Sequence, residues 1–276
     1  MQERGRVQLL EPVRQARMTW MITLVLLMSA LSISCSTVRQ TPVQQTPVQQ
    51  TPVEHDSLSG IGGRTVSEEQ RRADMETVRE RVREELLDVS VTIVRTEHLM
   101  NTLREDGTWP GINYEDLSRT GFEHTEHLGN MVELARAYKI PSSPVYLDPE
   151  LKRVIWRALD FWVNHNFISD NWWYNEIGTP QSIGNLLLIM DEDLKESQIA
   201  GAAPIMGRAT LDAQGARPGG DLIQIAGIMG RYALFLKDLV MLEEAVSAIA
   251  GEIGFAADRG DPSDRRGLQT DFSFHH

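Results

Sequence analysis

Residues that could do chemistry are most concentrated between positions 170 and 180, where the sequence reads DNWWYNEIGTP. Two tryptophans and a tyrosine lie there beside amide and carboxylate side chains. Flat aromatic rings can stack on a sugar ring while neighbouring polar groups bind its hydroxyls. A buried aromatic corner between two helices explains the same residue types, because tryptophan is often largely buried. The composition of this run therefore leaves sugar contact and core packing as equal alternatives.

Two carboxylates, Asp106 and Glu176, could provide the acid and base of a glycoside hydrolase built on helices. For Glu176 the alternative is a structural role, in which a buried carboxylate accepts hydrogen bonds from a turn. We favour the structural role and keep the hydrolase as an alternative function.

Two histidines, His124 and His127, are separated by two residues and raise the question of a metal site. Their acidic neighbours Glu123 and Glu126 could add ligands, but a His-x-x-His pattern without a clear third ligand is a weak signal. We therefore predict no metal and no cofactor, and we expect His127 to line a cleft or to pack in the core.

The charge balance bears on the choice of partner. Among 276 residues, 39 Asp and Glu outnumber 27 Lys and Arg, which gives a net charge of -12. Non-specific nucleic-acid binding needs a basic face that releases phosphate counterions, so we expect no nucleic-acid partner. An acidic polysaccharide is still compatible with this charge, because a local group of arginines can outweigh the overall sign.

Residues 1–35 have the pattern of a signal peptide. A basic flank precedes the apolar residues 18–34, which are too few for a comfortable membrane-spanning helix. Cys35, the single cysteine, lies where a bacterial lipoprotein is cleaved and lipidated, although Ser32 occupies a position where leucine is usual. We predict an exported lipoprotein at the cell surface or in the periplasm, attached to the membrane only through this lipid. Simple secretion is the alternative.

Residues 36–64 form a linker rich in Thr, Pro and Gln. The sequence repeats TPVQQ, TPVQQ and TPVEH from Thr41 to His55, and glycines and serines follow. A proline every fifth residue among polar residues cannot bury a core, so this segment is expected to be an extended stalk.

The remaining chain, residues 65–276, predicts an all-α fold of antiparallel helix pairs, because apolar residues recur at helical spacing and no segment alternates well enough for a sheet. Ser67 and Asp148 are expected to cap two of the helices. Residues 201–220 are rich in glycine and predict a loop with at most one short helix. The predicted helical segments are Ser67–Arg104, a segment around Leu128–Tyr138, Pro149–Asn164, Ile183–Met190, Asp221–Leu236 and Asp238–Phe255.

The order of several motifs resembles the N-terminal catalytic domain of polysaccharide lyase family eight, which includes hyaluronate, chondroitin AC and xanthan lyases. The resemblance covers roughly residues 70–276, and the tryptophan run is its most specific part. The motifs are DGTW at 106–109, NY at 113–114, His127 with Arg136 and Tyr138, NWWYNEIGTP at 171–180, and GLQTDFSF at 267–274.

This resemblance implies an incomplete (α/α) toroid and cleavage of a uronic-acid polysaccharide by β-elimination. A base removes the C5 proton, the C4 oxygen leaves, and an asparagine neutralises the carboxylate of the sugar. The implied substrate is an anionic polymer of the hyaluronan, chondroitin or xanthan type. The resemblance assigns Trp172 and Trp173 to an aromatic platform for the substrate. The other candidates for substrate binding are Asn171, Asn175, Glu176, Trp109 and His127, and the two asparagines could equally hold the turn.

The catalytic residues of the family are incompletely matched. The family spacing after the DFSF motif places the catalytic histidine at position 277, so His276 would serve only with a shift of one residue. Arg217 occupies the position of the expected asparagine, and the expected tyrosine is absent. We therefore expect a fragment of a lyase with weak or no activity, and a non-catalytic carbohydrate-binding module is a further alternative.

Overall fold

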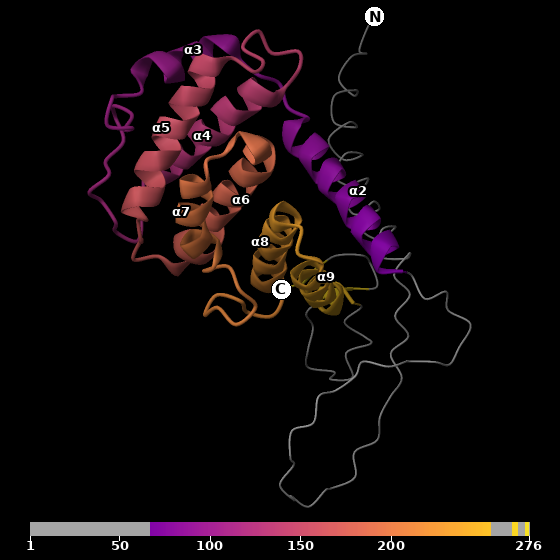
Figure 1. Cartoon of the computed structure of the whole chain (residues 1–276). Coiled ribbons are helices and arrows are strands. Elements are labelled where there is room, and N and C mark those ends of the chain that lie inside the picture. Colours follow the sequence, from indigo (N-terminus) through magenta and orange to yellow (C-terminus); the bar gives the residue numbers. More distant parts are fainter. Residues whose placement is uncertain (1–66, 255–266, 270–273, 276) are drawn as a thin grey trace, which may run out of the picture. The chain divides into compact units, whose positions relative to one another are not determined.

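The computed structural model describes residues 67–254, 267–269 and 274–275. The chain divides into two units, Met1–Arg64 and Thr65–His276, and every described residue belongs to the second. The predicted signal peptide, Cys35, the linker and His276 lie outside the described residues. The described part is helical, as predicted (Figure 1). No described helix combines the length and hydrophobicity that a membrane-spanning segment requires.

The helices follow one another along the chain and are joined by loops of varied length. Their bounds are α2 Glu68–Leu87, α3 Ile93–Thr102, α4 His124–Lys139, α5 Pro149–His165, the π-helix η1 Tyr174–Gly178, α6 Thr179–Met190, the 3₁₀ turn η2 Asp191–Asp193, α7 Glu196–Met206, α8 Gly220–Leu236 and α9 Leu239–Glu252.

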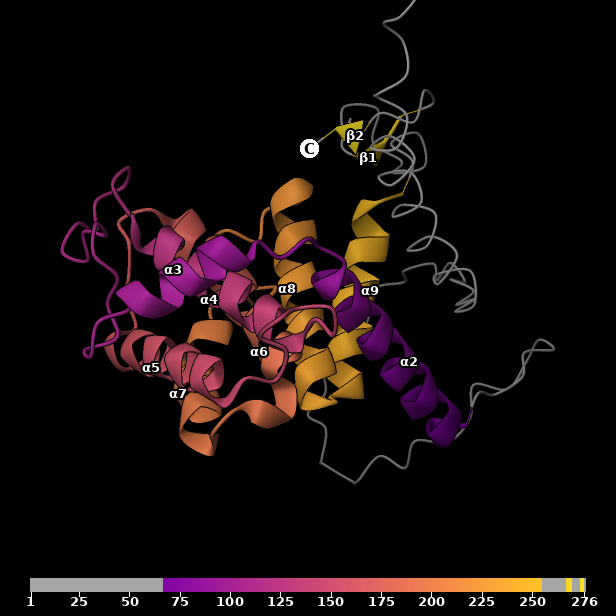
Figure 2. The ribbon, with the colours of Figure 1, turned by 90° about the horizontal axis from the view of Figure 1, so that it is seen from above.

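Helix α6 lies at the centre of the packing. It contacts α4, α7, α8 and α2, and it lies between α4 and α8 in both views (Figures 1 and 2). Its residues from Leu186 to Met190 are all buried, which confirms the predicted inner helix. A helix that is apolar on most sides must be surrounded by others, because exposing it would leave apolar surface in water.

Helix α5 shows how sequence periodicity becomes packing. Asp148 caps it, since its Oδ1 accepts hydrogen bonds from the backbone N–H of Glu150 at 2.7 Å and of Leu151 at 3.2 Å. The predicted apolar stripe is buried in full, and the helix packs on α4 and α7. Its buried residues are Leu151, Val154, Ile155, Ala158, Leu159 and Trp162.

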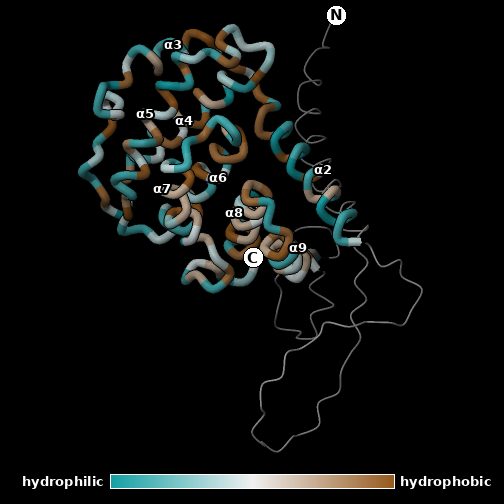
Figure 3. The backbone as a smooth tube through the Cα atoms, viewed as in Figure 1, coloured by the Kyte–Doolittle hydropathy of each residue, from teal (hydrophilic) through white to brown (hydrophobic). Residues whose placement is uncertain are grey.

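Helices α8 and α9 are joined by Lys237 and Asp238 and pack along each other, as expected for an antiparallel helix pair. Both are mostly apolar in sequence, whereas α2 carries many charged residues; the colouring in Figure 3 follows this contrast. Ser67 caps α2 as predicted, because its Oγ accepts from the N–H of Gln70 at 3.1 Å.

Two predictions of secondary structure are wrong. The segment Ser67–Arg104 is broken between α2 and α3, where Val89 and Val91 are poor helix formers and Thr92 is extended. The segment 201–220 is a loop apart from its start, where the short helix allowed by the prediction is the end of α7, which runs to Met206 and buries Ala202 and Ile205. Two short strands, β1 Gly267–Leu268 and β2 Phe274–His275, form an antiparallel pair where no sheet was predicted.

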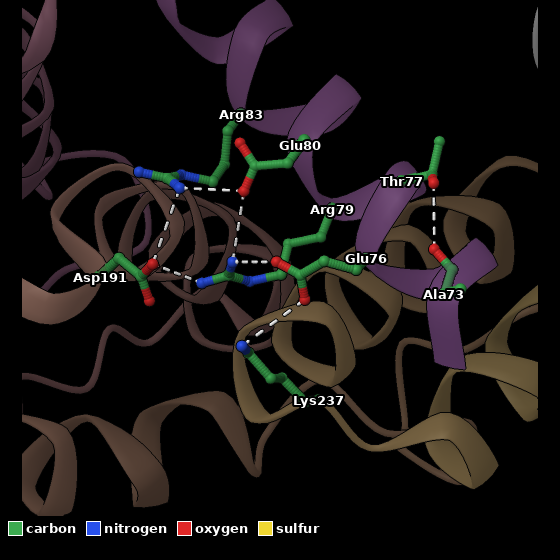
Figure 4. A network of polar contacts seen from close by, with 8 residues as sticks. All are labelled: Ala73, Glu76, Thr77, Arg79, Glu80, Arg83, Asp191 and Lys237. Atoms are coloured by element: carbon green, nitrogen blue, oxygen red, sulfur yellow. Dashed lines mark hydrogen bonds and ion pairs between the residues drawn. The ribbon is translucent and has the colours of Figure 1, made fainter. Parts of the chain in front are cut away.

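A network of ion pairs holds α2 against the end of α6 (Figure 4). The side chain of Arg79 is only 5% exposed and pairs with Glu76 at 2.8 Å, with Glu80 at 3.4 Å and with Asp191. Arg83 also pairs with Asp191, at 3.7 Å. Burial disfavours the charge on Arg79, but the hydrogen bond to Asp191 and the surrounding carboxylates outweigh burial, so the pKa of Arg79 is raised. The charge of this arginine is neutralised within the fold.

Candidate functional site

The tryptophan run is helical from Trp172 onward. Trp172 and Trp173 form the first helical turn, η1 follows, and α6 continues directly from it. The N–H of Thr179 bonds to the carbonyl of Tyr174 five residues earlier, which defines the π-turn. Pro180 lies in the first turn of α6, where a missing N–H is tolerated. The wide π-turn changes the direction of the side chains that precede α6, and such turns are frequent at functional sites.

The two tryptophans differ in exposure. Trp173 is 37% exposed, and its ring meets Tyr174 edge-on with 5.5 Å between ring centroids. Gly178 allows this position, since a Cβ there would lie 2.8 Å from Trp173 Cζ3. Trp172 is half-buried and packs against the hydrophobic core. Trp173 is therefore the ring that this site offers more fully to a ligand.

A loop between α7 and α8 lies against Trp172. A Cβ on Gly215 would lie 2.1 Å from Trp172 Cζ3, so only glycine allows the backbone to approach the ring this closely. The Arg217 guanidinium lies over the same ring, with its Cζ 4.7 Å from the ring centroid. Arg217 is exposed, and within residues 67–254 no carboxylate lies at ion-pair distance from it.

Glu176 fastens this loop to η1. Its Oε2 accepts a hydrogen bond from the N–H of Gly215 at 2.6 Å. This bond confirms the structural alternative, in which a carboxylate accepts from a turn. Asp106 is engaged in the same manner, because its Oδ1 accepts from the N–H of Thr108 at 3.0 Å and from the Thr108 hydroxyl at 2.7 Å. Glu176 and Asp106, the two carboxylates of the glycoside hydrolase alternative, thus both accept hydrogen bonds from backbone N–H groups.

The asparagines of the run hold the chain just before the tryptophans. Asn175 accepts from the N–H of Ser169 at 2.8 Å and donates to its carbonyl at 2.8 Å. Asn171 accepts from the N–H of Trp173 at 3.1 Å and donates to the carbonyl of Arg119 at 3.4 Å. Both amides make backbone contacts, and their expected contact with substrate stays a prediction.

Trp109 and His127, which were candidates for substrate contact, are both buried, and for His127 this is the alternative of packing in the core. Trp109 is 2% exposed and donates its Nε1–H to the carbonyl of Leu99 at 3.0 Å. His127 is fully buried, with Nε2 3.1 Å from the carbonyl of Ala158 and Nδ1 2.9 Å from the Tyr114 hydroxyl. Neither ring offers a surface to a ligand, because helices α4 and α5 and the preceding loop enclose them.

The hydrogen bonds of His127 define its charge state. A carbonyl can only accept, so Nε2 carries the proton and Nδ1 accepts from Tyr114. Burial lowers the pKa of His127 to about 3, and burial raises the pKa of Tyr114 to about 12. A neutral histidine and a neutral tyrosine are thus locked in the core and are not free to exchange a proton with a ligand.

His124 is also buried, and its Nε2 lies 3.0 Å from the carbonyl of Tyr114. Burial lowers its pKa. In the described ranges, no group of three or more His, Cys, Asp or Glu side chains is arranged to hold a metal ion.

Sequence reasoning missed Ser169 and Gly215 as residues that shape the site. Ser169 is buried and holds Asn175, but a lone serine before an aspartate carries no distinctive signal. Gly215 stands two residues before Arg217 in a glycine-rich segment, where a single glycine carries no distinctive signal.

Comparison with known proteins gives a family. A model described as polysaccharide lyase family 8, N-terminal alpha-helical domain, matches residues 63–276. The chain is 29% identical over 178 residues to chondroitinase-AC of Pedobacter heparinus, covering 64% of this chain and 25% of that protein. It is 29% identical over 77 residues to the polysaccharide lyase 8 family protein HylA of Enterococcus faecalis, covering 26% of this chain and 6% of that protein. The chain thus spans a quarter or less of these relatives.

Solved structures give the same fold. A chondroitinase AC lyase, whose structures include oligosaccharide complexes, superposes with a TM-score of 0.63 at 26% identity, covering 74% of this chain and 29% of that one. A Paenibacillus xanthan lyase superposes with a TM-score of 0.58 at 18% identity, covering 74% of this chain and 21% of that one; at this identity the likeness concerns the fold alone. The architecture is the α/α toroid of these lyases. Together with the family match over residues 63–276, this shows that the chain belongs to polysaccharide lyase family 8 through its N-terminal α-helical domain.

Proposed function

We propose that this chain binds an anionic, uronic-acid-containing polysaccharide as the recognition part of a lyase that acts by β-elimination. The observation that carries the proposal is the exposed ring of Trp173, together with the cation Arg217, which lies over the ring of the preceding Trp172 and has no carboxylate partner among the described residues. An aromatic ring next to a cation fits a sugar that bears an acidic group. Membership of the family and the similarity to chondroitinase-AC of Pedobacter heparinus support the same substrate class.

The expected chemistry is removal of the C5 proton of a uronic acid, departure of the C4 oxygen and formation of an unsaturated uronide. Arg217 could neutralise the sugar carboxylate, but an arginine attracts the carboxylate in ground and transition states alike, and uniform binding does not by itself raise turnover. Tyr114 and His127 are buried and hydrogen-bonded to each other. We therefore propose that the described residues supply binding and that this chain alone gives little or no product.

The binding proposal is tested by titrating the chain with hyaluronan, chondroitin sulfate and xanthan while tryptophan fluorescence is recorded. Trp173→Ala is expected to weaken binding about tenfold, which corresponds to about 1.4 kcal/mol for the lost contact with the exposed aromatic ring. Tyr146→Ala is the matched control, because Tyr146 is an exposed aromatic in the loop before α5. Failure of all three polymers to bind would refute the proposal.

The catalytic part is tested separately by following the absorbance of the unsaturated product. Rapid formation of that product by this chain would contradict the proposal of a binding role. Release of reducing ends without a double bond would favour a glycoside hydrolase instead, but the engagement of Glu176 and Asp106 in backbone hydrogen bonds argues against that reaction.

We also propose that the protein is exported and anchored through a lipid on Cys35, with residues 36–64 as a stalk. The apolar residues 18–34 before the single cysteine support this. Metabolic labelling with a radioactive fatty acid in a bacterial host should label the chain, and Cys35→Ser should abolish the label. Export of an unlabelled wild-type chain would support simple secretion.

A further inference from the structure

Helix α2 is attached to the rest of the domain differently at its two ends. We infer that its N-terminal part, residues 68–78, is a strap that exposed ion pairs hold on α8 and α9 and that lifts off as the ionic strength rises, while residues 79–87 stay docked. The strap is a conformational device of the fold and is independent of the proposed polysaccharide binding. In the anchored protein it would make the reach of the domain from the membrane depend on salt, and this consequence alone rests on the proposed lipid anchor.

Two ion pairs join the strap to the helices beneath it, and both are open to solvent. Arg71 pairs with Glu243 of α9 at 2.9 Å, and these side chains are 42% and 48% exposed. Glu76 pairs at 3.6 Å with Lys237, which lies between α8 and α9, and these side chains are 43% and 57% exposed (Figure 4). The Debye length falls from about 10 Å at 0.1 M salt to about 3 Å at 1 M, so salt weakens both pairs.

The packing beneath the strap is open. A groove of about 490 Å³ is lined by the first turns of α2 and by the junction of α8 and α9. Leu236 and Val240 line this groove and are 44% and 66% exposed, so apolar packing does not close this part of the contact. Met75 is the single buried residue of the strap, and it packs with Leu188 and Leu234 in a small cluster separate from the main core. Little buried apolar surface therefore holds the strap in place.

The rest of α2 is docked more firmly. The side chain of Arg79 is 5% exposed and pairs with the partly buried Asp191, and salt screens such a pair much less than an exposed one. Leu86 and Leu87 pack against the main core, and Arg136 Nε donates to the carbonyl of Leu86 at 2.9 Å. Arg79 therefore marks the point at which the strap turns away from the domain.

A strap that has lifted does not persist as a helix. Residues 68–78 are eleven residues, which are too few for a stable helix in water without packing against other elements. Their backbone N–H groups consequently lose protection from hydrogen exchange. Each released residue can extend from a rise of about 1.5 Å to about 3.3 Å, which lengthens the connection to residues 36–64.

Hydrogen exchange of the full chain, resolved to short peptides by mass spectrometry, measures this lifting. Between about 0.05 M and about 1 M NaCl, residues 71–78 should exchange about tenfold faster, whereas residues 82–87 and helix α6 should change by less than about twofold. Oxidation of Met75 to its sulfoxide by hydrogen peroxide is an independent measure and should accelerate in parallel. Met131 of α4, which is fully buried, is the internal reference for this oxidation.

Variants outside α2 test the ion pairs without altering the helix propensity of the strap. Glu243→Gln removes the partner of Arg71 and should speed the exchange of residues 71–78 about threefold at low salt. The double variant with Lys237→Gln should speed it about tenfold and should respond little to added salt, because the pairs that salt screens are absent. Glu244→Gln is the matched control, since it removes the same charge from the next position of α9 and breaks no ion pair among the described residues.

The outcomes decide the inference without polysaccharide or lipid, so they are separate from the tests of the proposed function. Faster exchange confined to residues 71–78, with Glu244→Gln behaving as the wild type does, supports the strap. Exchange that responds neither to salt nor to Glu243→Gln would overturn it, because the small apolar cluster would then hold the helix. Equal acceleration of residues 82–87, or an equal effect of Glu244→Gln, would overturn it as well.

Discussion

Arg79 and Arg217 show two different uses of the same side chain. Arg79 is buried between α2 and the end of α6 and is surrounded by Glu76, Glu80 and Asp191. Arg217 is exposed on the loop between α7 and α8 and lies over Trp172 without a described carboxylate partner. A buried charge must be paired within the fold, because desolvation without compensation would be unfavourable, whereas an exposed charge can be left unpaired. The difference separates a structural arginine from a candidate ligand-binding one.

The largest expected effect is the loss of stability in Arg79→Met. Removal of this cation leaves Asp191 partly buried beside two other carboxylates, so the free energy of unfolding should fall by about 3 kcal/mol. Urea denaturation followed by circular dichroism measures the change. Arg217→Met should lie within about 0.5 kcal/mol of wild type in the same assay. Equal losses in the two variants would contradict the distinction between them.

Gly215→Ala tests whether the loop needs its close approach to Trp172. The added methyl group would lie 2.1 Å from the Trp172 ring and 2.6 Å from Glu176 Oε2, so the loop must move. We expect a destabilisation of about 1–3 kcal/mol and weaker binding of acidic oligosaccharides. Gly129→Ala in α4 is the control, since a Cβ at that exposed helical position meets no described atom within 4 Å. Unchanged binding by Gly215→Ala would show that Arg217 does not depend on this loop position.

His127 differs from both arginines, because it is buried without a charged partner and is therefore neutral in the folded state. Its pKa is lowered to about 3 by burial, compared with an ordinary value of 6.5 in the unfolded chain. The unfolded state therefore binds the proton first as the pH falls, so stability is complete above about pH 6.5 and declines by roughly 1.4 kcal/mol per pH unit between that value and about pH 3.

Urea denaturation between pH 7 and pH 5 measures this decline. The lowered pKa of buried His124 should act in the same direction. His127→Gln keeps a side chain that can donate and accept hydrogen bonds but does not titrate. The variant should therefore be less stable at pH 7 and should show a smaller decline of the unfolding free energy between pH 7 and pH 5. A wild-type chain whose stability is constant over this range would show that His127 is protonated or exposed.

The smallest effect is expected from Glu176. Glu176→Ala removes the acceptor for the N–H of Gly215 and should lower stability by about 1 kcal/mol and weaken binding of acidic oligosaccharides. Glu176→Gln keeps an oxygen that accepts this bond and should bind nearly as the wild type does. A loss in Glu176→Gln as large as that in Glu176→Ala would contradict the tether and indicate a role for the carboxylate charge itself.

Sequence reasoning succeeded where a local rule decides the structure. The stripe on α5 and its cap at Asp148 follow from 3.6-residue periodicity and from side-chain hydrogen bonding at a helix N-terminus. The inner helix α6 follows from its lack of polar residues. The break at residues 88–92 was not predicted, because the valines near Val91 are compatible with a helix or a strand, and the full extent of α7 was not predicted, because Gly201 is a poor helix former that is needed here for the close approach to Val163.

The amino-acid sequence by itself determined the helical class, the family through its ordered motifs, and the presence of an unusual tryptophan pair. The tertiary structure decided how the members of that pair differ. Trp172 and Trp173 are adjacent and chemically identical, so no local rule assigns one of them to the core. The loop carrying Gly215 and Arg217 comes some forty positions later and covers only one of the two rings. Only the folding of distant segments against each other makes Trp172 a support and leaves Trp173 exposed.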